Sequence, residues 1–211
     1  MEGVPDESVE RWAVRRVRAT RNRLLEAAAV LVQERGLHGF TFDDVASAAG
    51  VSRATAYRQF PGRLALLKGL LLRYSPLEPV VTTIERMRDQ PPAEVMPALA
   101  RTAVRVVDEN RGLLLSLISD VARLDEEVLE TIRYAAARAA AVAVPYLLAQ
   151  IAARRLRPVH PVLALQAFIG PLFVHVVTRP TLGALPLPGA LPSLEEAAEQ
   201  LAAGWLRAYA A

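Results

Sequence analysis

The chain has 211 residues, 53% of them hydrophobic and 22% charged, which excludes an intrinsically disordered protein and allows one large or two small domains. It contains no cysteine, which excludes disulfide bonds, thiolate metal sites and a cysteine nucleophile. The net charge of +3 is uneven, since residues 11–73 hold twelve Lys or Arg against four Asp or Glu and residues 74–211 are nearly balanced, so the first part of the chain is predicted to bind a polyanion.

The amino-terminal segment is acidic first and then strongly basic. Residues 1–14 are predicted to form a disordered tail, because the first ten include four acids and no Lys or Arg. The arginines that follow either track nucleic-acid phosphates or form an ordinary solvated helix end: Arg11, Arg15, Arg16, Arg18, Arg21 and Arg23. A helix with an apolar stripe then continues to about Glu34, and Gly36 ends it.

Residues 41–60 have the pattern of two short helices joined by a tight turn. Thr41 and Asp44 are spaced as a capping box, Gly50 suits a left-handed helix end, and Ser52 caps the second helix. The small apolar side chains that would join the two helices are Val45, Ala46, Ala49, Val51 and Ala56. This layout is typical of a helix-turn-helix, whose second helix enters the DNA major groove.

The second helix of this pair has side chains suited to a phosphate backbone. Polar or cationic residues crowd into its seven positions: Ser52, Arg53, Thr55, Tyr57 and Arg58. An ordinary pair of surface helices is the alternative. Capping, turn, charge and aromatic placement agree, however, and they favour DNA binding.

Residues 18–73 resemble the DNA-binding domain of the tetracycline-repressor (TetR) family of bacterial regulators. The matching segments are Gly39-Phe40-Thr41, Val45-Ala46, Ala49-Gly50-Val51-Ser52, Thr55-Ala56-Tyr57-Arg58-Gln59-Phe60 and Pro61-Gly62-Arg63, before a leucine-rich helix. Two positions depart from the family pattern. Gln59 stands where histidine or tyrosine is common, and Leu64 stands where an acid is common.

The resemblance implies an all-α protein with two folded domains. Residues 15–62 would form a three-helix helix-turn-helix DNA-binding domain, and residues 63–211 a helical ligand-binding and dimerisation domain. In the family, the positions of Ser52, Thr55, Tyr57 and Arg63 hold phosphates, and those near Arg53 and Ala54 reach base edges. The expected DNA contacts are Thr41, Ser52, Arg53, Ala54, Thr55, Tyr57, Arg58 and Arg63.

As the resemblance also implies, the rest of the chain is expected to form further helices, at about 77–89, 93–109, 111–123, 125–156, 160–178 and 193–209. Pro145 should kink the fourth of these, and residues 181–192 form an apolar, proline-rich loop. Apolar faces at helical spacing, together with aromatic residues, either pack the core or line a pocket for a small apolar or aromatic ligand. The candidate pocket residues are Met96, Leu99, Thr102, Ala103, Leu117, Val121, Tyr134, Tyr146, Phe168 and His175.

The last two predicted helices have small and medium apolar residues at spacings of three and four. They are candidates for a four-helix bundle between two copies of the chain: Leu163, Ala167, Gly170, Val174, Leu194, Ala198, Leu201 and Trp205. A two-fold dimer would present two recognition helices to a palindromic operator. Residues 158–178 are uncharged and long enough to cross a bilayer, but prolines and polar residues interrupt them, so we expect a buried core helix and no membrane span.

These observations and the resemblance to the TetR family together imply a cytoplasmic, homodimeric regulator of transcription that binds double-stranded operator DNA, most simply a repressor released by a small apolar ligand. The beginning of the chain lacks an apolar signal segment. The histidines His38, His160 and His175 sit in unrelated contexts, so we expect no catalytic residue, no metal site and no cofactor. The alternatives are a helical interaction protein that does not bind DNA, or a small-molecule-binding protein.

Overall fold

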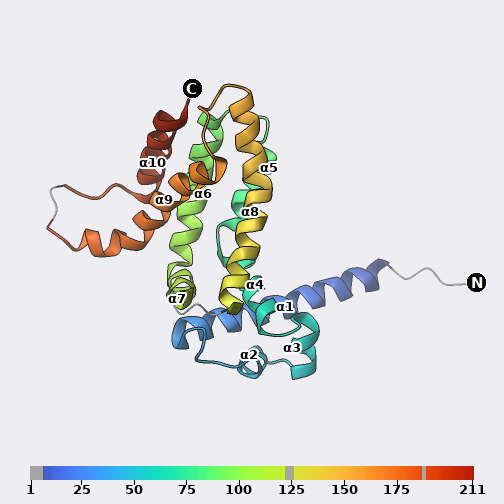
Figure 1. Ribbon diagram of the computed structural model, residues 1–211. Helices are drawn as coiled ribbons and strands as arrows, with labels where there is room; N and C mark the ends of the chain where they lie inside the picture. The colour runs from blue at the N-terminus through green and yellow to red at the C-terminus, as the bar shows by residue number, and fades with distance from the viewer. Residues whose placement is uncertain (1–6, 122–125, 187–188) are drawn as a thin grey trace, which may run out of the picture. The chain divides into compact units, whose positions relative to one another are not determined.

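The computed structural model describes residues 7–121, 126–186 and 189–211, without the side chains of residues 7–11, 13, 117–121, 127 and 128. Within these ranges every extended regular element is a helix, which confirms the predicted all-α class (Figure 1). The chain divides into two compact units. The amino-terminal unit comprises the chain up to Leu70 together with residues 116–131, and the carboxyl-terminal unit comprises residues 71–115 and 132–211.

Ten helices follow one another in the described part of the chain. They are α1 (Glu7–Arg35), α2 (Phe42–Ala48), α3 (Arg53–Gln59), α4 (Arg63–Tyr74), α5 (Leu77–Arg86), α6 (Pro92–Glu109), α7 (Arg111–Val121), α8 (Glu126–Ala152), α9 (Pro161–Gly183) and α10 (Leu194–Tyr209). Helix α1 begins at Glu7, so the part of the predicted tail from residue 7 to residue 14 is helical. Residues 1–6 of that predicted tail lie outside the described residues.

The helix ends of the amino-terminal unit confirm the capping signals in the sequence. The backbone N–H of Thr41 donates to Asp44 Oδ2 at 2.7 Å, and the N–H of Asp44 donates to Thr41 Oγ1 at 3.2 Å. The Thr41 hydroxyl also donates to Asp44 Oδ2, at 2.8 Å. The backbone N–H and the hydroxyl of Thr41 hold the pKa of the Asp44 carboxyl below its usual value, because they stabilise the ionised form. Gly36 and Gly50 adopt φ values of +71° and +63°, the left-handed conformation that glycine reaches at little cost.

The core of the amino-terminal unit is built where α1, α2 and α3 pack against one another. Leu24, Val45, Ala56 and Leu70 are fully buried there, and Phe60 is 1% exposed. The same unit contains the first two turns of α4, whose buried leucines include Leu66 and Leu67. The predicted domain boundary between residues 62 and 63 therefore precedes two turns of α4 that belong to the amino-terminal unit.

Gly69 lies inside α4 at a point of close packing. A methyl group at this position would lie 2.7 Å from Phe60 Cε1 and 3.0 Å from Leu25 Cδ2. Helix propensity alone predicts that Gly69→Ala stabilises the protein by about 1 kcal/mol. The buried Phe60 ring cannot move aside without disturbing the core, so we expect a net loss of about 1–3 kcal/mol in the free energy of unfolding.

Urea unfolding followed by circular dichroism measures this effect. Gly112→Ala is the matched control, because nothing lies within 4 Å of the methyl group it would add. We expect the control to gain up to about 1 kcal/mol, because it improves helix propensity without meeting a neighbouring atom. Stabilisation by both variants would contradict the packing argument.

In the carboxyl-terminal unit, α6 packs against α5, α9 and α10, and α10 also packs against α9. The indole N–H of Trp205 donates to the carbonyl of Ala164 at 2.9 Å, and the Phe168 and Trp205 rings meet edge to face at 5.9 Å. Ser193 and Glu196 form a second capping box at the start of α10. These contacts tie the last two helices to the centre of their own unit.

Three predicted helix ends were wrong. Helix α5 ends at Arg86 and not near residue 89. Helix α9 continues past residue 178 to Gly183, so the loop predicted at 181–192 begins later, because Pro180 removes one backbone hydrogen bond without ending the helix. Helix α8 ends at Ala152 and not near residue 156. Arg154 there adopts a φ of +56°, and the N–H of Arg155 turns back to the carbonyl of Gln150.

The prediction of a buried core helix at 158–178 was also wrong in part. Helix α9 buries one stripe at a spacing of four residues, Ala164, Phe168, Leu172 and Val176, while other apolar side chains remain exposed. Two helices, over Leu129–Ala152 and Pro161–Gly183, are long and apolar enough to cross a membrane, and 22% of the most apolar window is buried in each. One or two such helices are weak evidence for a membrane protein.

Candidate DNA-binding surface and ligand cavity

Helix α3 separates its buried and exposed faces cleanly. Ala56 is fully buried, whereas Arg53, Ala54, Tyr57 and Arg58 are exposed. Four predicted DNA contacts therefore share one accessible surface, because the helical period turns them away from the buried alanine. A helix that buries only one small side chain can be presented at the surface with most of its length available to a partner.

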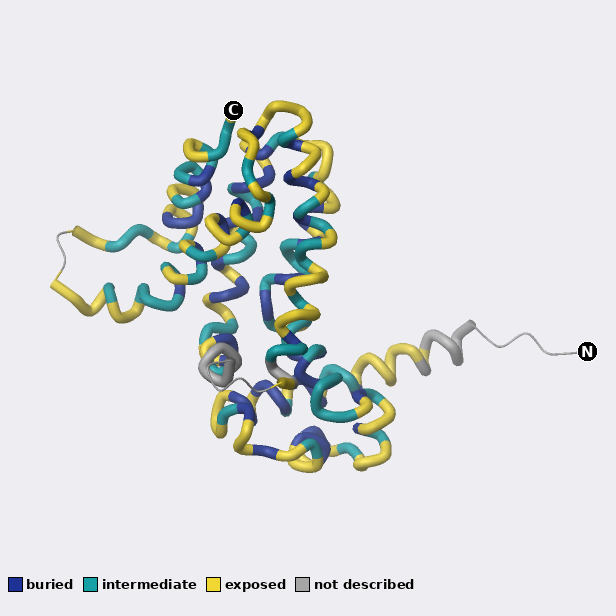
Figure 2. Tube along the Cα trace, viewed as in Figure 1, coloured by how far each residue is buried: buried dark blue, intermediate teal, exposed yellow. Residues whose placement is uncertain are grey.

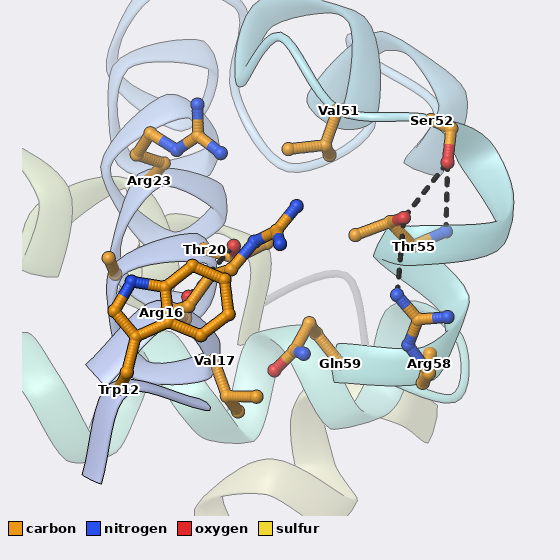
Figure 3. A pocket seen from close by; sticks show the side chains of 11 residues that line it. Trp12, Arg16, Val17, Thr20, Arg23, Val51, Ser52, Thr55, Arg58 and Gln59 are labelled. Carbon is orange, nitrogen blue, oxygen red and sulfur yellow. Dashed lines mark hydrogen bonds between the residues drawn. The ribbon is translucent and has the colours of Figure 1, made fainter. Parts of the chain in front are cut away.

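Hydroxyl groups at the start of α3 are linked to an arginine one turn later (Figure 3). The N–H of Thr55 donates to Ser52 Oγ at 3.2 Å, and Ser52 Oγ donates to Thr55 Oγ1 at 2.9 Å. Arg58 Nη2 donates to Thr55 Oγ1 at 3.4 Å. This chain orders two hydroxyls and a guanidinium on one edge of α3, a set of groups that suits the oxygens of a phosphate.

Arg53 is held from two sides. Its Nε lies 3.2 Å from Asp43 Oδ1 on α2, and its guanidinium lies 5.5 Å from the centre of the Tyr57 ring. The Tyr57 ring in turn packs against Phe42 at 4.6 Å. Asp43 was missed by sequence reasoning. An acid in an otherwise basic segment was the available signal, and only the fold places it against Arg53.

The structure gives Arg63 a bracing contact with the connector before α2. Its guanidinium donates to the carbonyl of Phe40 at 3.3 Å and also to the carbonyl of Leu37, and it lies over the Phe40 ring. These contacts join the start of α4 to the chain segment that leads into Thr41. Thr41 itself is exposed, and its hydroxyl is part of the α2 capping box.

The carboxyl-terminal unit contains an apolar cavity of about 290 Å³. Five predicted pocket residues line it, namely Met96, Leu99, Ala103, Tyr146 and Phe168. Helices α5 and α8 supply walls that sequence reasoning missed, among them Val80, Ile84, Ala135, Ala139 and Ala143. Alanines carry little pattern of their own, so the Ala-rich run of α8 gave no sign that it lines a cavity.

The lining of this cavity carries no ionised side chain. The Tyr146 hydroxyl donates to the carbonyl of Gln90 at 3.2 Å, and burial raises the pKa of Tyr146, so the phenol stays neutral. Ser75 Oγ accepts a hydrogen bond from the N–H of Leu77 at 3.3 Å. A charged ligand would lose its hydration there without gaining an opposite charge, so the cavity suits a neutral apolar molecule.

The other predicted pocket residues lie elsewhere or are not described. Thr102 and the exposed Tyr134 are not among the lining residues, and neither is His175. His175 Nε2 is buried without a hydrogen-bond partner among the described residues, and burial together with Arg179 lowers its pKa. The side chains of Leu117 and Val121 lie outside the described residues.

The predicted dimerisation residues separate into three groups by burial. Ala198 and Trp205 are buried within their own unit, whereas Gly170, Leu194 and Leu201 are half-buried. The accessible group on α9 consists of Ala167, Leu163 and Val174, the last two each 58% exposed. Among the described residues predicted for dimerisation, the exposed apolar side chains therefore lie on α9.

Comparison with known proteins identifies both parts of this architecture. Residues 24–70 match the model of the bacterial regulatory proteins of the tetR family. The chain matches none of the curated proteins in sequence. Among solved structures, it is similar to the TetR family transcriptional regulator PfmR from Thermus thermophilus, with 24% identity, 88% of this chain and 97% of that chain covered, and a TM-score of 0.60.

Two further structures share the fold. The fatty acid degradation regulator FadR from Bacillus halodurans is 16% identical, with 88% of this chain and 97% of that chain covered and a TM-score of 0.70. The ketosteroid transcriptional regulator KstR2 of Mycobacterium tuberculosis is 20% identical, with 90% and 95% covered and a TM-score of 0.59. At these identities the likeness concerns the fold, and it extends through the carboxyl-terminal unit. Residues 24–70 therefore match the amino-terminal domain of the tetR family of bacterial regulatory proteins, and the chain shares the fold of solved TetR family regulators.

Proposed function

We propose that the chain is a homodimeric, cytoplasmic repressor that binds a palindromic operator and is released by a small, neutral, apolar ligand. The observation that carries the DNA part is the exposed face of α3, where Ser52, Arg53, Tyr57 and Arg58 are accessible and partly pre-ordered by their own contacts. Phosphate contacts would come from the hydroxyls and Arg58, and base contacts from Arg53 and Ala54.

The exposed stripe of α9 supports the dimer. Leu163 and Val174 each leave more than half of their surface to solvent, on the helix whose opposite stripe is buried in its own unit. Apolar side chains gathered on one helix face are typical of an interface between subunits. A second copy of the chain would cover them around a two-fold axis and would set two α3 helices on one palindrome.

The uncharged cavity supports the choice of ligand. One of the proteins with a similar fold is named for ketosteroids, which are neutral and predominantly apolar compounds. Leu71 and Ser75 line the cavity at the end of α4, and the beginning of the same helix carries Arg63. Ligand binding would shift α4 and with it the connector that Arg63 braces. The shift in DNA affinity is limited by the difference in ligand affinity between the two states.

Selection of bound duplexes from a random pool tests the DNA part of the proposal. We expect an inverted repeat, with half-sites about one helical turn or a multiple of it apart. The affinity for the selected duplex should fall steeply with salt, since phosphate contacts release counterions. A protein that is monomeric in solution, or that enriches no duplex at low salt, would refute the proposal.

Asp43→Asn is expected to change DNA recognition without changing stability. The pair between Asp43 and Arg53 is exposed, so its loss should alter the free energy of unfolding by less than about 1 kcal/mol. Removing a carboxylate from the DNA-facing surface should raise the affinity for any duplex by roughly threefold to tenfold, while the freed Arg53 discriminates less well between operator and scrambled DNA. Fluorescence anisotropy with both duplexes measures the two effects.

Asp89→Asn is the control for this substitution. It makes the same change in net charge at an exposed position of the carboxyl-terminal unit. Equal changes in both variants would mean that only the net charge matters and that Asp43 does not restrain Arg53.

Ala139→Phe is expected to fill the cavity and to weaken ligand binding by at least about tenfold, which corresponds to 1.4 kcal/mol. The probe is the neutral apolar dye N-phenyl-1-naphthylamine, whose fluorescence rises in an apolar site. Ala141→Phe is the matched control, because Ala141 is an exposed residue of α8 that does not line the cavity. Dye binding that is equal in both variants would place the ligand site elsewhere.

A further inference from the structure

A second cavity, of about 600 Å³, lies entirely within the amino-terminal unit, between the amino-terminal half of α1 and helix α3 (Figure 3). On α1 its lining includes Trp12, Arg16, Thr20 and Arg23, and on α3 it includes Thr55 and Arg58. The spacings along α1 are those of one helix face, since residues three, four and seven apart lie above one another. We call this cavity the α1–α3 groove.

The groove is strongly cationic. It carries the guanidinium groups of Arg16, Arg23 and Arg58, and no Asp or Glu is among its lining residues. Ser52 and Thr55 line it as well, so it is continuous with the hydroxyl edge of α3 that the proposed function assigns to phosphates. A groove with this charge is complementary to a polyanion.

The described side chains of α1 before Thr20 are exposed beside the groove (Figure 2). Trp12 is 57% exposed and Val17 is 52% exposed. The guanidinium of Arg16 lies 5.3 Å from the centre of the Trp12 ring, and the Thr20 hydroxyl donates to the Arg16 carbonyl at 3.0 Å. Stacking on the indole limits the directions in which Arg16 can point, and so helps to keep its charge at the groove.

The spacing of the cations favours a strand over a small anion. Arg16 and Arg23 are two helical turns apart, which is roughly 10 Å along the axis of α1. A DNA strand, which carries one phosphate about every 3.4 Å along the duplex axis, presents separate phosphates to each.

We propose that the α1–α3 groove holds the sugar–phosphate backbone of operator DNA immediately outside the half-site contacted by α3. This inference rests on the proposed function, and it adds a binding surface that begins with α1. Arg16 and Arg23 neutralise flanking phosphates, Arg58 and Thr55 connect this contact with the half-site, and Trp12 positions Arg16. The footprint of the protein therefore extends beyond the base pairs that α3 reads.

The first test measures the salt dependence of binding to the selected operator. The double variant Arg16→Ala, Arg23→Ala removes two phosphate contacts from each subunit. The slope of log affinity against log salt should become shallower by about 1.8 per subunit, or about 3.6 for a dimer. The control is Arg15→Ala with Arg18→Ala, which removes the same charge from exposed positions of α1 outside the groove.

We expect the control slope to change by less than half as much. If the two double variants have equal slopes of log affinity against log salt while the wild-type protein binds its operator, the proposal that the α1–α3 groove holds the DNA backbone is wrong. Failure of the wild-type protein to bind any duplex would instead overturn the proposed function. Circular dichroism verifies that both variants retain the helical content of the wild-type chain.

The second test uses the tryptophan fluorescence of the wild-type protein. Trp12 is the exposed tryptophan and Trp205 is only 5% exposed, so acrylamide quenching reports mainly on Trp12. A duplex with several flanking base pairs should protect Trp12 from acrylamide, whereas a duplex trimmed to the two half-sites should not. The signal should disappear in Trp12→Phe. Equal quenching with bound flanked and trimmed duplexes would overturn the proposal.

Discussion

The variant Phe60→Ala is expected to lose about 3–5 kcal/mol of unfolding free energy, the cost of removing a large aromatic ring from a packed core. Phe60 ends α3 and is 1% exposed. The Arg21 guanidinium covers its ring at 4.1 Å, and Arg21 Nη1 donates to the carbonyl of Gln59 at 3.0 Å. The substitution therefore leaves a cavity beneath α4 and also removes the surface on which Arg21 rests.

Urea unfolding followed by circular dichroism measures this loss, and operator binding reports whether α3 remains in place. Phe60→Leu is the matched control, because leucine fills much of the volume of the ring, and we expect it to cost far less. A change of less than about 1 kcal/mol in Phe60→Ala would mean that the amino-terminal unit does not depend on this contact. The packing described around Gly69 would then also be in doubt.

The variant Arg53→Ala is expected to weaken operator binding by about 1–3 kcal/mol per half-site, since it removes a side chain predicted to reach a base edge. For a dimer on a palindrome, two such losses amount to roughly 30-fold to 10⁴-fold in affinity. The loss should be much smaller on scrambled DNA, so the preference for the operator falls. Electrophoretic mobility shift or anisotropy titration with both duplexes measures this preference.

Tyr57→Phe is the comparison for Arg53→Ala. It removes only a hydroxyl from the exposed face of α3 and keeps the ring that packs at 4.6 Å against Phe42. The loss of a phosphate contact should weaken binding to all duplexes alike. The division between base-reading and phosphate-binding residues is wrong if both variants change the preference for operator over scrambled DNA by the same factor.

Local signals were sufficient to predict the helix-turn-helix. Thr41 with Asp44, Gly50 and Ser52 each act over three or four residues, so the backbone conformation they favour does not depend on distant parts of the chain. The same holds for the all-α class, which follows from the periodicity of apolar residues over long segments. The predicted ends of α8 and α9 were wrong. Arg154 follows the end of α8 with a positive φ, and Pro180 lies inside α9 without ending it. The periodicity of apolar residues indicates neither.

The candidate sites were predicted less completely. Met96, Leu99 and Ala103 were predicted from helical spacing and Tyr146 and Phe168 as aromatic walls, and these five line the cavity. Thr102 shares the spacing of the first three and does not line the cavity, nor do Tyr134 and His175. Spacing places a residue on a face of its helix, and it does not say which neighbouring element that face meets. The cavity walls from α5 and α8 and the restraint of Arg53 by Asp43 therefore could not be predicted, because they depend on how separate helices pack.

The sequence by itself determined the all-α class, the capped recognition helix and the cationic character of the first part of the chain. These properties follow from neighbouring residues and from composition, which folding does not alter. Tertiary structure alone decided that Gly69 has no room for a methyl group, that Trp205 is buried in its own unit while Leu163 is not, and that Arg16 and Arg23 face α3 across a groove. Each of these depends on contacts between residues far apart in the chain, and only the packing of one helix against another sets them.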